Sequence, residues 1–417
     1  MKLLVATKPM LNNNMEIMSY CFRYQKADEF LAQPARVTED LMDQPCVDLL
    51  QKIGLNGFTN GHPIFVPISK FSLLMPISGL EASIPPEKIT YLLSPGIVPD
   101  DVIVGRMKKL KEMGFNFAVE NVVDYDSMSP FIELSDYILI SFKRSEGKLE
   151  EYRRISRIYP NHQFIASDVQ SPEMFESLKG SGFVCFEGKF HNMPFSQGDE
   201  STPIAPVKIN RIQLVNTVRE EDFSIEDVVN IVSRDPSLTI SLLTMINSPY
   251  LGLSQKVTGV QQAVALLGQK EVRKWVTTAI VGLLADDRPQ EITRTALLRA
   301  KFAENLAKHF EKAIHSQSLF LMGLFSLLDT MMEMTMEAAL KVILVSDVIR
   351  DALINKAGDF APVMDMVIRY EAADWYEVKR MMALSGLDAS DVSGAYLEAV
   401  QWYDSIVSEA IEMESDK

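Results

Sequence analysis

Five histidines and three cysteines are the side chains of this sequence best suited to metal binding or nucleophilic chemistry. No histidine forms a pair with an Asp at a spacing that one helical face would need to hold a metal. His309 and His315 flank the end of a Lys-rich helix, and at six residues apart they face different sides of it. We interpret all five as separate surface side chains: His62, His162, His191, His309 and His315.

The cysteines, Cys21, Cys46 and Cys185, are too few and too scattered for a disulfide framework or a zinc cluster. We expect reduced thiols in the core of a cytoplasmic protein. The sequence also lacks the glycine-rich loops that cradle phosphates and the G-x-S-x-G turn that presents a catalytic serine. It therefore predicts no cofactor.

The composition sets limits on the partners. The chain has 417 residues and a net charge of −15, from 41 Lys and Arg against 56 Asp and Glu. Such an acidic surface repels nucleic acids, so we do not expect nucleic-acid binding. Hydrophobic residues make up 47%, which is enough for packed cores. The longest apolar stretches, such as 275–285, are shorter than the roughly 20 residues of a membrane span, so no membrane partner is expected.

Strand-like and helix-like segments alternate in the first half of the chain. Strands are expected at 115–119, 137–140, 163–166 and 182–186, and helices at 100–113, 148–158 and 171–179. Strands that alternate with helices of about ten residues predict repeated βα units and a mostly parallel sheet. This pattern fits either a small β/α barrel or an open doubly wound sheet.

From residue 209 onward the apolar residues follow a helical period instead, which predicts an all-helical domain. The stretch before it is rich in Pro, Ser and acidic residues. We therefore predict an α/β domain over 1–195, a linker over 196–207 and an all-helical domain over 208–417.

The helical half resembles the HDOD domain, a relative of the HD phosphohydrolases that lacks their catalytic residues. The resemblance rests on the turn at 247–249, on the V-x-x-A-V-A-L-L-G run that ends at Gly268, and on Val272 and Trp275. The segments 320–340, 369–375 and 396–402 are similar to the C-terminal extension found where HDOD follows an EAL domain.

That tandem arrangement implies that the first half is an EAL-type β/α barrel, a fold that hydrolyses cyclic di-GMP with two divalent metals. The matching segments are 9–24, 110–122 and 183–194. The resemblance lies in layout, because the positions where the family supplies its metal ligands hold mostly other residues. Those positions fall at Cys21, Pro67, Tyr91, Ser94, Glu120, Asn121, Leu139, Ser141, Ser167, Asp168, Gln170 and Glu187.

Three carboxylates survive in that set, Glu120, Asp168 and Glu187. Two Mg²⁺ or Mn²⁺ ions need several carboxylates to offset their charge, so we expect no metal site and no hydrolysis. In the helical half, Ser326 and Leu327 replace the His-Asp doublet that an active HD enzyme needs. We therefore predict no enzymatic activity and assign no catalytic, cofactor-binding or metal-ligating residue.

The leading hypothesis is a signalling scaffold linked to cyclic di-GMP control of motility or biofilm, with a protein partner on the HDOD half. Resemblance also implies a homodimer through the barrel. One alternative is a receptor that binds cyclic di-GMP without cleaving it, with Lys143, Arg144 and Lys189 as candidate phosphate contacts. The other is an active phosphodiesterase with repositioned acids.

Two groups of side chains fit either a core or a partner surface. One is the Met-rich stretch of Met331, Met332, Met334 and Met336. The other is a set of aromatic residues near the C-terminus, Tyr370, Trp375, Trp402 and Tyr403. We expect core packing for most of both groups.

Overall fold

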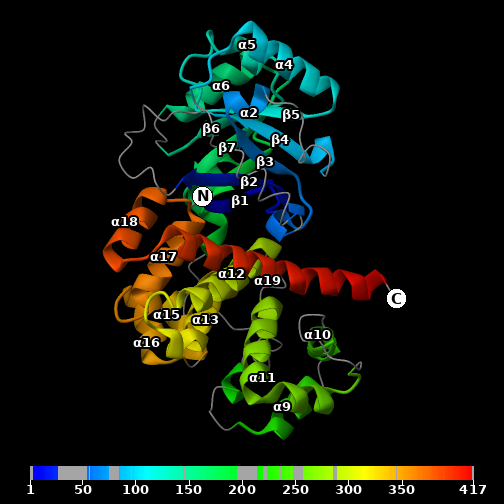
Figure 1. Cartoon of the computed structure of the whole chain (residues 1–417), viewed down its shortest axis with the longest axis vertical. Helices are drawn as coiled ribbons and strands as arrows, with labels where there is room; N and C mark the ends of the chain where they lie inside the picture. The colour runs from blue at the N-terminus through cyan, green and yellow to red at the C-terminus, as the bar shows by residue number, and fades with distance from the viewer. Residues whose placement is uncertain are drawn as a thin grey trace. The chain divides into compact units, whose positions relative to one another are not determined.

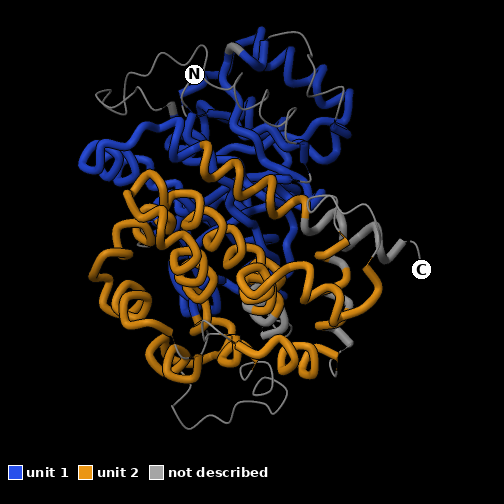
Figure 2. Tube along the Cα trace, turned by 60° about the horizontal axis from the view of Figure 1, so that its bottom comes forward, with its two compact units in different colours: residues 1–193, 369–393 blue, residues 194–368, 394–417 orange. Residues whose placement is uncertain are grey.

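The chain forms two compact units, coloured separately in Figure 2. The first contains Met1–Met193 and Arg369–Ser393, and the second contains Pro194–Ile368 and Gly394–Lys417. The computed structural model describes residues 3–26, 54–55, 57–74, 84–94, 96–143, 147–194, 214–218, 223–233, 236–247, 257–284, 289–343 and 345–415.

A closed eight-stranded barrel forms the first unit, drawn from blue to green in Figure 1. Strands β2 to β8 run parallel, and β1 is antiparallel to both of its neighbours, β2 and β8. The sequence-based choice between a barrel and an open sheet is thereby settled in favour of the barrel. The strands are β1 (Leu3–Leu11), β2 (Ile17–Lys26), β3 (Ile64–Ile68), β4 (Ile89–Leu93), β5 (Asn116–Glu120), β6 (Tyr137–Ser141), β7 (Gln163–Val169) and β8 (Cys185–Gly188).

Helices follow the parallel strands from β3 to β7, as βα units require. The expected helix over 100–113 is confirmed as α4. The Asp100 carboxylate caps its N-terminus by accepting a hydrogen bond from the Ile103 N–H. Ser171 caps α7 in the same way, with Pro172 in the first turn. The helical elements of this part are α2 (Lys70–Leu74), η2 (Pro86–Lys88), α4 (Asp101–Glu112), α5 (Ser129–Ile132), α6 (Lys148–Ile158), α7 (Pro172–Leu178) and η3 (Phe190–Asn192).

The described elements after residue 200 are helical, which confirms the predicted all-helical second half. They are α9 (Ile225–Val232), α10 (Pro236–Ile246), α11 (Val260–Leu284), α12 (Gln290–Leu306), η5 (Ala313–His315), α13 (Ser316–Phe325), α14 (Leu328–Met332), α15 (Met336–Val342), α16 (Asp347–Arg350), η6 (Asp351–Asn355), α17 (Ala361–Glu371), α18 (Trp375–Ser385) and α19 (Ala389–Ser415). Gly268 kinks α11 with a φ of +72°, a backbone conformation that glycine adopts readily.

The division into units differs from the predicted domain layout at the C-terminus. We predicted one helical domain over 208–417, yet Arg369–Ser393 belongs with the barrel. The physical reason is the packing of Tyr370, which is fully buried and accepts a hydrogen bond from the Val5 N–H of β1. The predicted linker, 196–207, lies outside the described residues, and its role stays a prediction.

Gly323 lies at the close approach of α12 and α13, where a Cβ would meet the Arg299 carbonyl oxygen at 2.5 Å and the Ala300 nitrogen at 2.6 Å. We expect Gly323→Ala to lower the free energy of unfolding by about 1–3 kcal/mol, because the backbones must move apart. The matched control is Gly394→Ala in α19, where nothing lies within 4 Å of the new Cβ. The control should stabilise by about 0.5–1 kcal/mol, as expected for Ala in a helix. Thermal unfolding followed by circular dichroism checks both, and equal shifts would contradict the close approach.

Candidate functional site at the mouth of the barrel

A continuous apolar layer fills the middle of the barrel. Each strand contributes one buried side chain to it: Met10, Cys21, Phe65, Leu92, Ala118, Leu139, Ile165 and Cys185. Burial raises the pKa of the Cys21 thiol to about 12, and that of Cys185 to about 12 as well, so both thiols stay protonated at neutral pH. Two of the twelve ligand positions inferred from the sequence, Cys21 and Leu139, thus lie in the apolar core and not in an open site.

Charged side chains form the next layer, at the carboxyl ends of the parallel strands. Side chains alternate along a strand, so Arg23, Glu120 and Glu187 lie on the same side as Cys21, Ala118 and Cys185, one step nearer the mouth. Lys8 joins them from β1, two residues before Met10, because β1 runs in the opposite direction. The carboxyl ends of barrel strands are where TIM-type folds place their functional groups.

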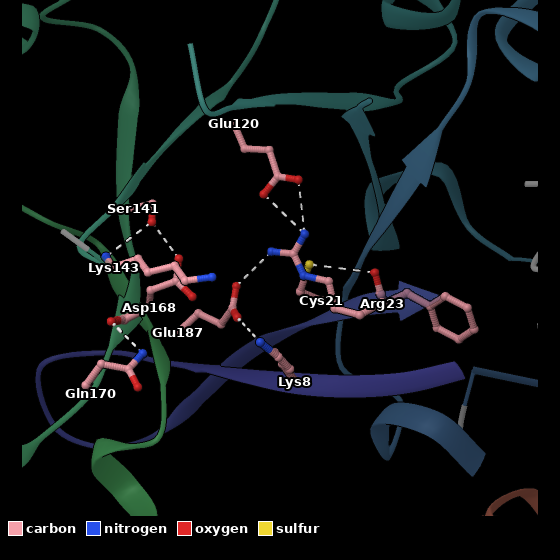
Figure 3. A network of polar contacts seen from close by, with 10 residues as sticks. Lys8, Cys21, Arg23, Glu120, Ser141, Lys143, Asp168, Gln170 and Glu187 are labelled. Atoms are coloured by element: carbon pink, nitrogen blue, oxygen red, sulfur yellow. Dashed lines mark hydrogen bonds and ion pairs between the residues drawn. The ribbon is translucent and has the colours of Figure 1, made fainter. Parts of the chain in front are cut away.

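Arg23 links the two carboxylates of this layer, as Figure 3 shows. Its Nη1 donates to Oε1 and Oε2 of Glu120 at 3.1 and 3.2 Å. Its Nη2 donates to Oε2 of Glu187 at 3.0 Å, and the Lys8 Nζ lies 3.2 Å from Oε1 of the same carboxylate. Two cations and two carboxylates therefore form one chain of ion pairs: Lys8, Glu187, Arg23 and Glu120.

Glu187 is the most deeply placed member, with its side chain only 2% exposed. Burial by itself would raise its pKa, but the charges and hydrogen bonds of Lys8 and Arg23 outweigh that effect and lower the pKa to about 2. The carboxylate is thus ionised at neutral pH because two cations hold it. A divalent cation at the same oxygens would have to displace both.

A second polar pair lies across the mouth, between β6 and β7. The Ser141 hydroxyl donates to Oδ2 of Asp168 at 2.5 Å, and the Lys143 N–H donates to the Ser141 hydroxyl at 3.3 Å. Asp168 has a φ of +59°, in a strand stretch where the pairing of β7 with β8 shifts register. Asn121, directly after Glu120, has a φ of +54°. Left-handed backbone outside glycine stores strain, and such strain is typical of functional sites.

The remaining predicted ligand positions do not add to the ion-pair chain in the structure. Tyr91 stacks on Phe115 at 5.4 Å between ring centroids and lies one residue before Leu92, so it faces away from the barrel interior. Pro67 and Ser94 lie two residues beyond the apolar layer, and neither carries a carboxylate. Gln170 is exposed, and its side-chain amide donates to the Asp168 carbonyl oxygen. Ser167 is buried.

Sequence reasoning missed the two cations of the site. It named Lys143, Arg144 and Lys189 as phosphate candidates, but Lys143 and Lys189 are exposed, and Arg144 lies outside the described residues. The cations of the ion-pair chain are Lys8 and Arg23. The available signal was the spacing of Arg23, two residues after Cys21 and therefore on the same face of the strand.

The helical unit was the other place where a metal site was considered. At the position of the missing doublet, the Ser326 hydroxyl donates to the Gly323 carbonyl oxygen at 2.7 Å and accepts from Arg299 Nη1 at 3.1 Å. Leu327 is buried. Across the described part of the chain, no group of three or more His, Cys, Asp or Glu side chains is placed to hold a metal ion.

Two of the five histidines differ in their surroundings. His191 is buried, against the expectation of a surface side chain, and its ring packs edge-on against Phe190 at the end of the barrel sequence. His162 Nε2 lies 2.8 Å from the Ile132 carbonyl oxygen.

The Met-rich stretch is core, as expected, with Met331, Met332 and Met334 buried. The aromatic residues divide, since Tyr370 and Tyr403 are buried while Trp375 and Trp402 are half-buried.

A family model supplies the identity of the helical unit. The HDOD domain model matches residues 203–346. This part of the chain is an HDOD domain. Its described helices run from α9 to α15, and the segment that carries Gly268 and Trp275 falls within them. The resemblance inferred from the sequence is confirmed for this half.

Two curated proteins match along nearly the whole chain. Uncharacterized protein YuxH of Bacillus subtilis is 27% identical over 96% of this chain and 98% of its own length. The protein named cyclic di-GMP phosphodiesterase CdgJ, of Vibrio cholerae, is 23% identical over 95% of this chain and 91% of its own length.

The region before the HDOD domain resembles solved structures of EAL proteins. One is PaMucR phosphodiesterase in complex with c-di-GMP, at 15% identity over 45% of this chain and 94% of that chain, with a TM-score of 0.37. Another is a standalone EAL protein from Vibrio cholerae in its c-di-GMP-bound form, at 18% identity over 48% and 94%, with a TM-score of 0.35. Of the helices that the structure describes, none is long and apolar enough to cross a membrane.

Removal of the Glu187 charge tests the ion-pair chain. We expect Glu187→Gln to lower the free energy of unfolding by about 3 kcal/mol at pH 7, because Lys8 and Arg23 lose their shared counter-charge. The matched control, Glu176→Gln, removes an exposed carboxylate 3.5 Å from Lys179, and should cost less than about 0.5 kcal/mol. Urea unfolding of both variants measures the difference.

The same carboxylate predicts a pH dependence with a definite sign. The folded pKa of Glu187, about 2, lies below its usual value of 4.5, so its stabilisation is complete above pH 4.5 and is lost as pH falls toward 2. We expect Glu187→Gln to remove about 3 kcal/mol of the acid dependence of stability across that window. Identical acid profiles for wild type and variant would contradict the assigned ion pairs.

Proposed function

We propose that this protein is a cytoplasmic signal-transduction protein in which the barrel is catalytically inactive and the HDOD domain binds a protein partner. The setting would be a response linked to cyclic di-GMP, such as motility or biofilm. The similarity to the relative named cyclic di-GMP phosphodiesterase CdgJ supports this setting. The observation that carries the proposal of inactivity is the pairing of Glu120 and Glu187 with Arg23 and Lys8.

Electrostatics makes those paired carboxylates poor metal ligands. Two divalent cations need carboxylate oxygens whose charge is available. Here the negative charges of Glu120 and Glu187 are balanced by two fixed cations that would repel an incoming metal. At an effective dielectric constant near 20, each pair of unit charges 4 Å apart contributes about 4 kcal/mol, and a divalent ion doubles that repulsion. Asp168, bonded to the Ser141 hydroxyl, would be left as the only other acid named for the site.

A second candidate function is a receptor for cyclic di-GMP, favoured by the position of Arg23 and Lys8 at the mouth. A guanidinium and an ammonium are the donors that a phosphate prefers. The phosphate would have to replace Glu120 and Glu187 as their counter-ion, which leaves the buried Glu187 carboxylate without its cations. That exchange opposes binding, so we rank the receptor below the scaffold.

Hydrolysis assays test the proposal of inactivity. With Mg²⁺ or Mn²⁺ present, we expect no turnover of cyclic di-GMP by the full chain, and no difference between wild type and Glu120→Ala. Turnover that disappears in Glu120→Ala, at unchanged circular dichroism, would show a working metal site and overturn the proposal.

Calorimetry separates scaffold from receptor. The scaffold predicts no heat with cyclic di-GMP at high micromolar concentration. Heat that is lost in the charge-conserving variant Arg23→Lys, and kept in the exposed control Lys189→Gln, would establish the receptor instead.

The partner and the homodimer through the barrel stay predictions. A pull-down should use the full chain as bait, because Arg369–Ser393 belongs to the barrel unit and a 208–417 fragment would carry it without its support. Light scattering of the purified chain measures the oligomeric state.

A further inference from the structure

Strand β1 (Leu3–Leu11) is much longer than β8 (Cys185–Gly188), one of its two neighbours in the barrel. It pairs with β2 from Leu3 to Leu11, but within the described residues its register with β8 includes only Met10 and Leu11. Backbone N–H groups alternate sides along a strand, and the Val5 N–H points away from β2. The N–H groups of Leu3 and Thr7 share that side, and Pro9, at the next equivalent position, has no N–H. The barrel is closed by the pairs at Met10 and Leu11, but among the described residues the β1 edge from Leu3 to Thr7 has no strand partner toward β8; we call this stretch the β1–β8 seam.

Residues from the far end of the chain cover this seam. The Tyr370 hydroxyl accepts a buried hydrogen bond from the Val5 N–H at 3.2 Å. The next residue, Glu371, accepts through Oε1 from the Asn192 side-chain amide at 3.0 Å, just after β8. Two consecutive residues thus contact both sides of the seam, and both contacts lie within the first unit.

The covering segment is built as a rigid piece. The Tyr370 ring packs edge-on against Trp375 at 5.3 Å between centroids. The turn from α17 to α18 is closed by the Asp374 N–H, which donates to the Arg369 carbonyl oxygen at 2.9 Å, and by an ion pair of the Asp374 carboxylate with Arg369 at 3.1 Å. These bonds hold the side chains of 370 and 371 in a fixed relation to each other.

We propose that Arg369–Ser393 is a strap that closes the β1–β8 seam. An open strand edge is a template for pairing with another chain, so the strap protects the barrel from edge-to-edge association. The chain reaches the strap through α17, whose residues up to Ile368 belong to the second unit.

Hydrogen exchange of the full chain tests the strap. Tyr370→Phe keeps the ring packing against Trp375 and deletes the acceptor for Val5. We expect exchange at the Val5 amide to rise roughly tenfold, the effect of losing one buried hydrogen bond. Tyr376→Phe is the matched control, because Tyr376 lies on α18 with 75% of its surface exposed; its exchange at Val5 should equal that of wild type.

A second variant tests whether the strap moves as one body. Glu371→Ala removes the contact with Asn192, and a rigid strap predicts faster exchange at Val5 in this variant as well. Unchanged exchange at Val5 in Tyr370→Phe would overturn the proposal. So would an effect of Glu371→Ala that stays confined to residues 190–194, because the two contacts would then be independent.

Discussion

Arg23 occupies the centre of the barrel mouth, and its guanidinium joins carboxylates from strands that are far apart in sequence, Glu120 of β5 and Glu187 of β8. A planar group with several fixed donors suits this role better than an ammonium, because it can bind two carboxylates at once. The burial of Glu187 is tolerable only while Arg23 and Lys8 balance its charge. A divalent metal at these oxygens would have to compete with both cations.

The apolar layer beneath the mouth gives this interaction its setting. Side chains such as Phe65, Leu92 and Ile165 fill the barrel interior. The charged groups at the mouth therefore lie next to an apolar layer of low dielectric constant. Ion pairs beside such an apolar layer are screened less than ion pairs in water. The strained backbone at Asn121 and Asp168 lies at the same level, after β5 and within β7. Charged side chains and left-handed backbone therefore occur together at this end of the barrel.

Chain order and spatial order differ at the C-terminus. The match to the HDOD family model ends at residue 346. A later segment, Arg369–Ser393, belongs to the barrel unit. The two units are thus not separable by one cut of the chain. An experiment on either half by itself changes the surroundings of Tyr370 and Val5.

Local sequence patterns determined the type and order of many secondary-structure elements. Apolar periodicity, and helix caps such as Asp100 and Ser171, depend on neighbouring residues, so the alternating βα units and the helical HDOD half could be read from the sequence. The prediction that most metal-ligand positions hold other residues also came from the sequence, since it concerns residue type.

The ion-pair chain and the strap depended on the tertiary structure. Closure of the barrel decides which side chains of distant strands face one another, and a shift of one residue reverses the face. That is why Cys21 proved to lie in the core while Arg23 lies at the mouth. The contact of Tyr370 with Val5 joins residues 365 positions apart. No local pattern encodes such a contact, because it exists only once the chain has folded back on its first strand.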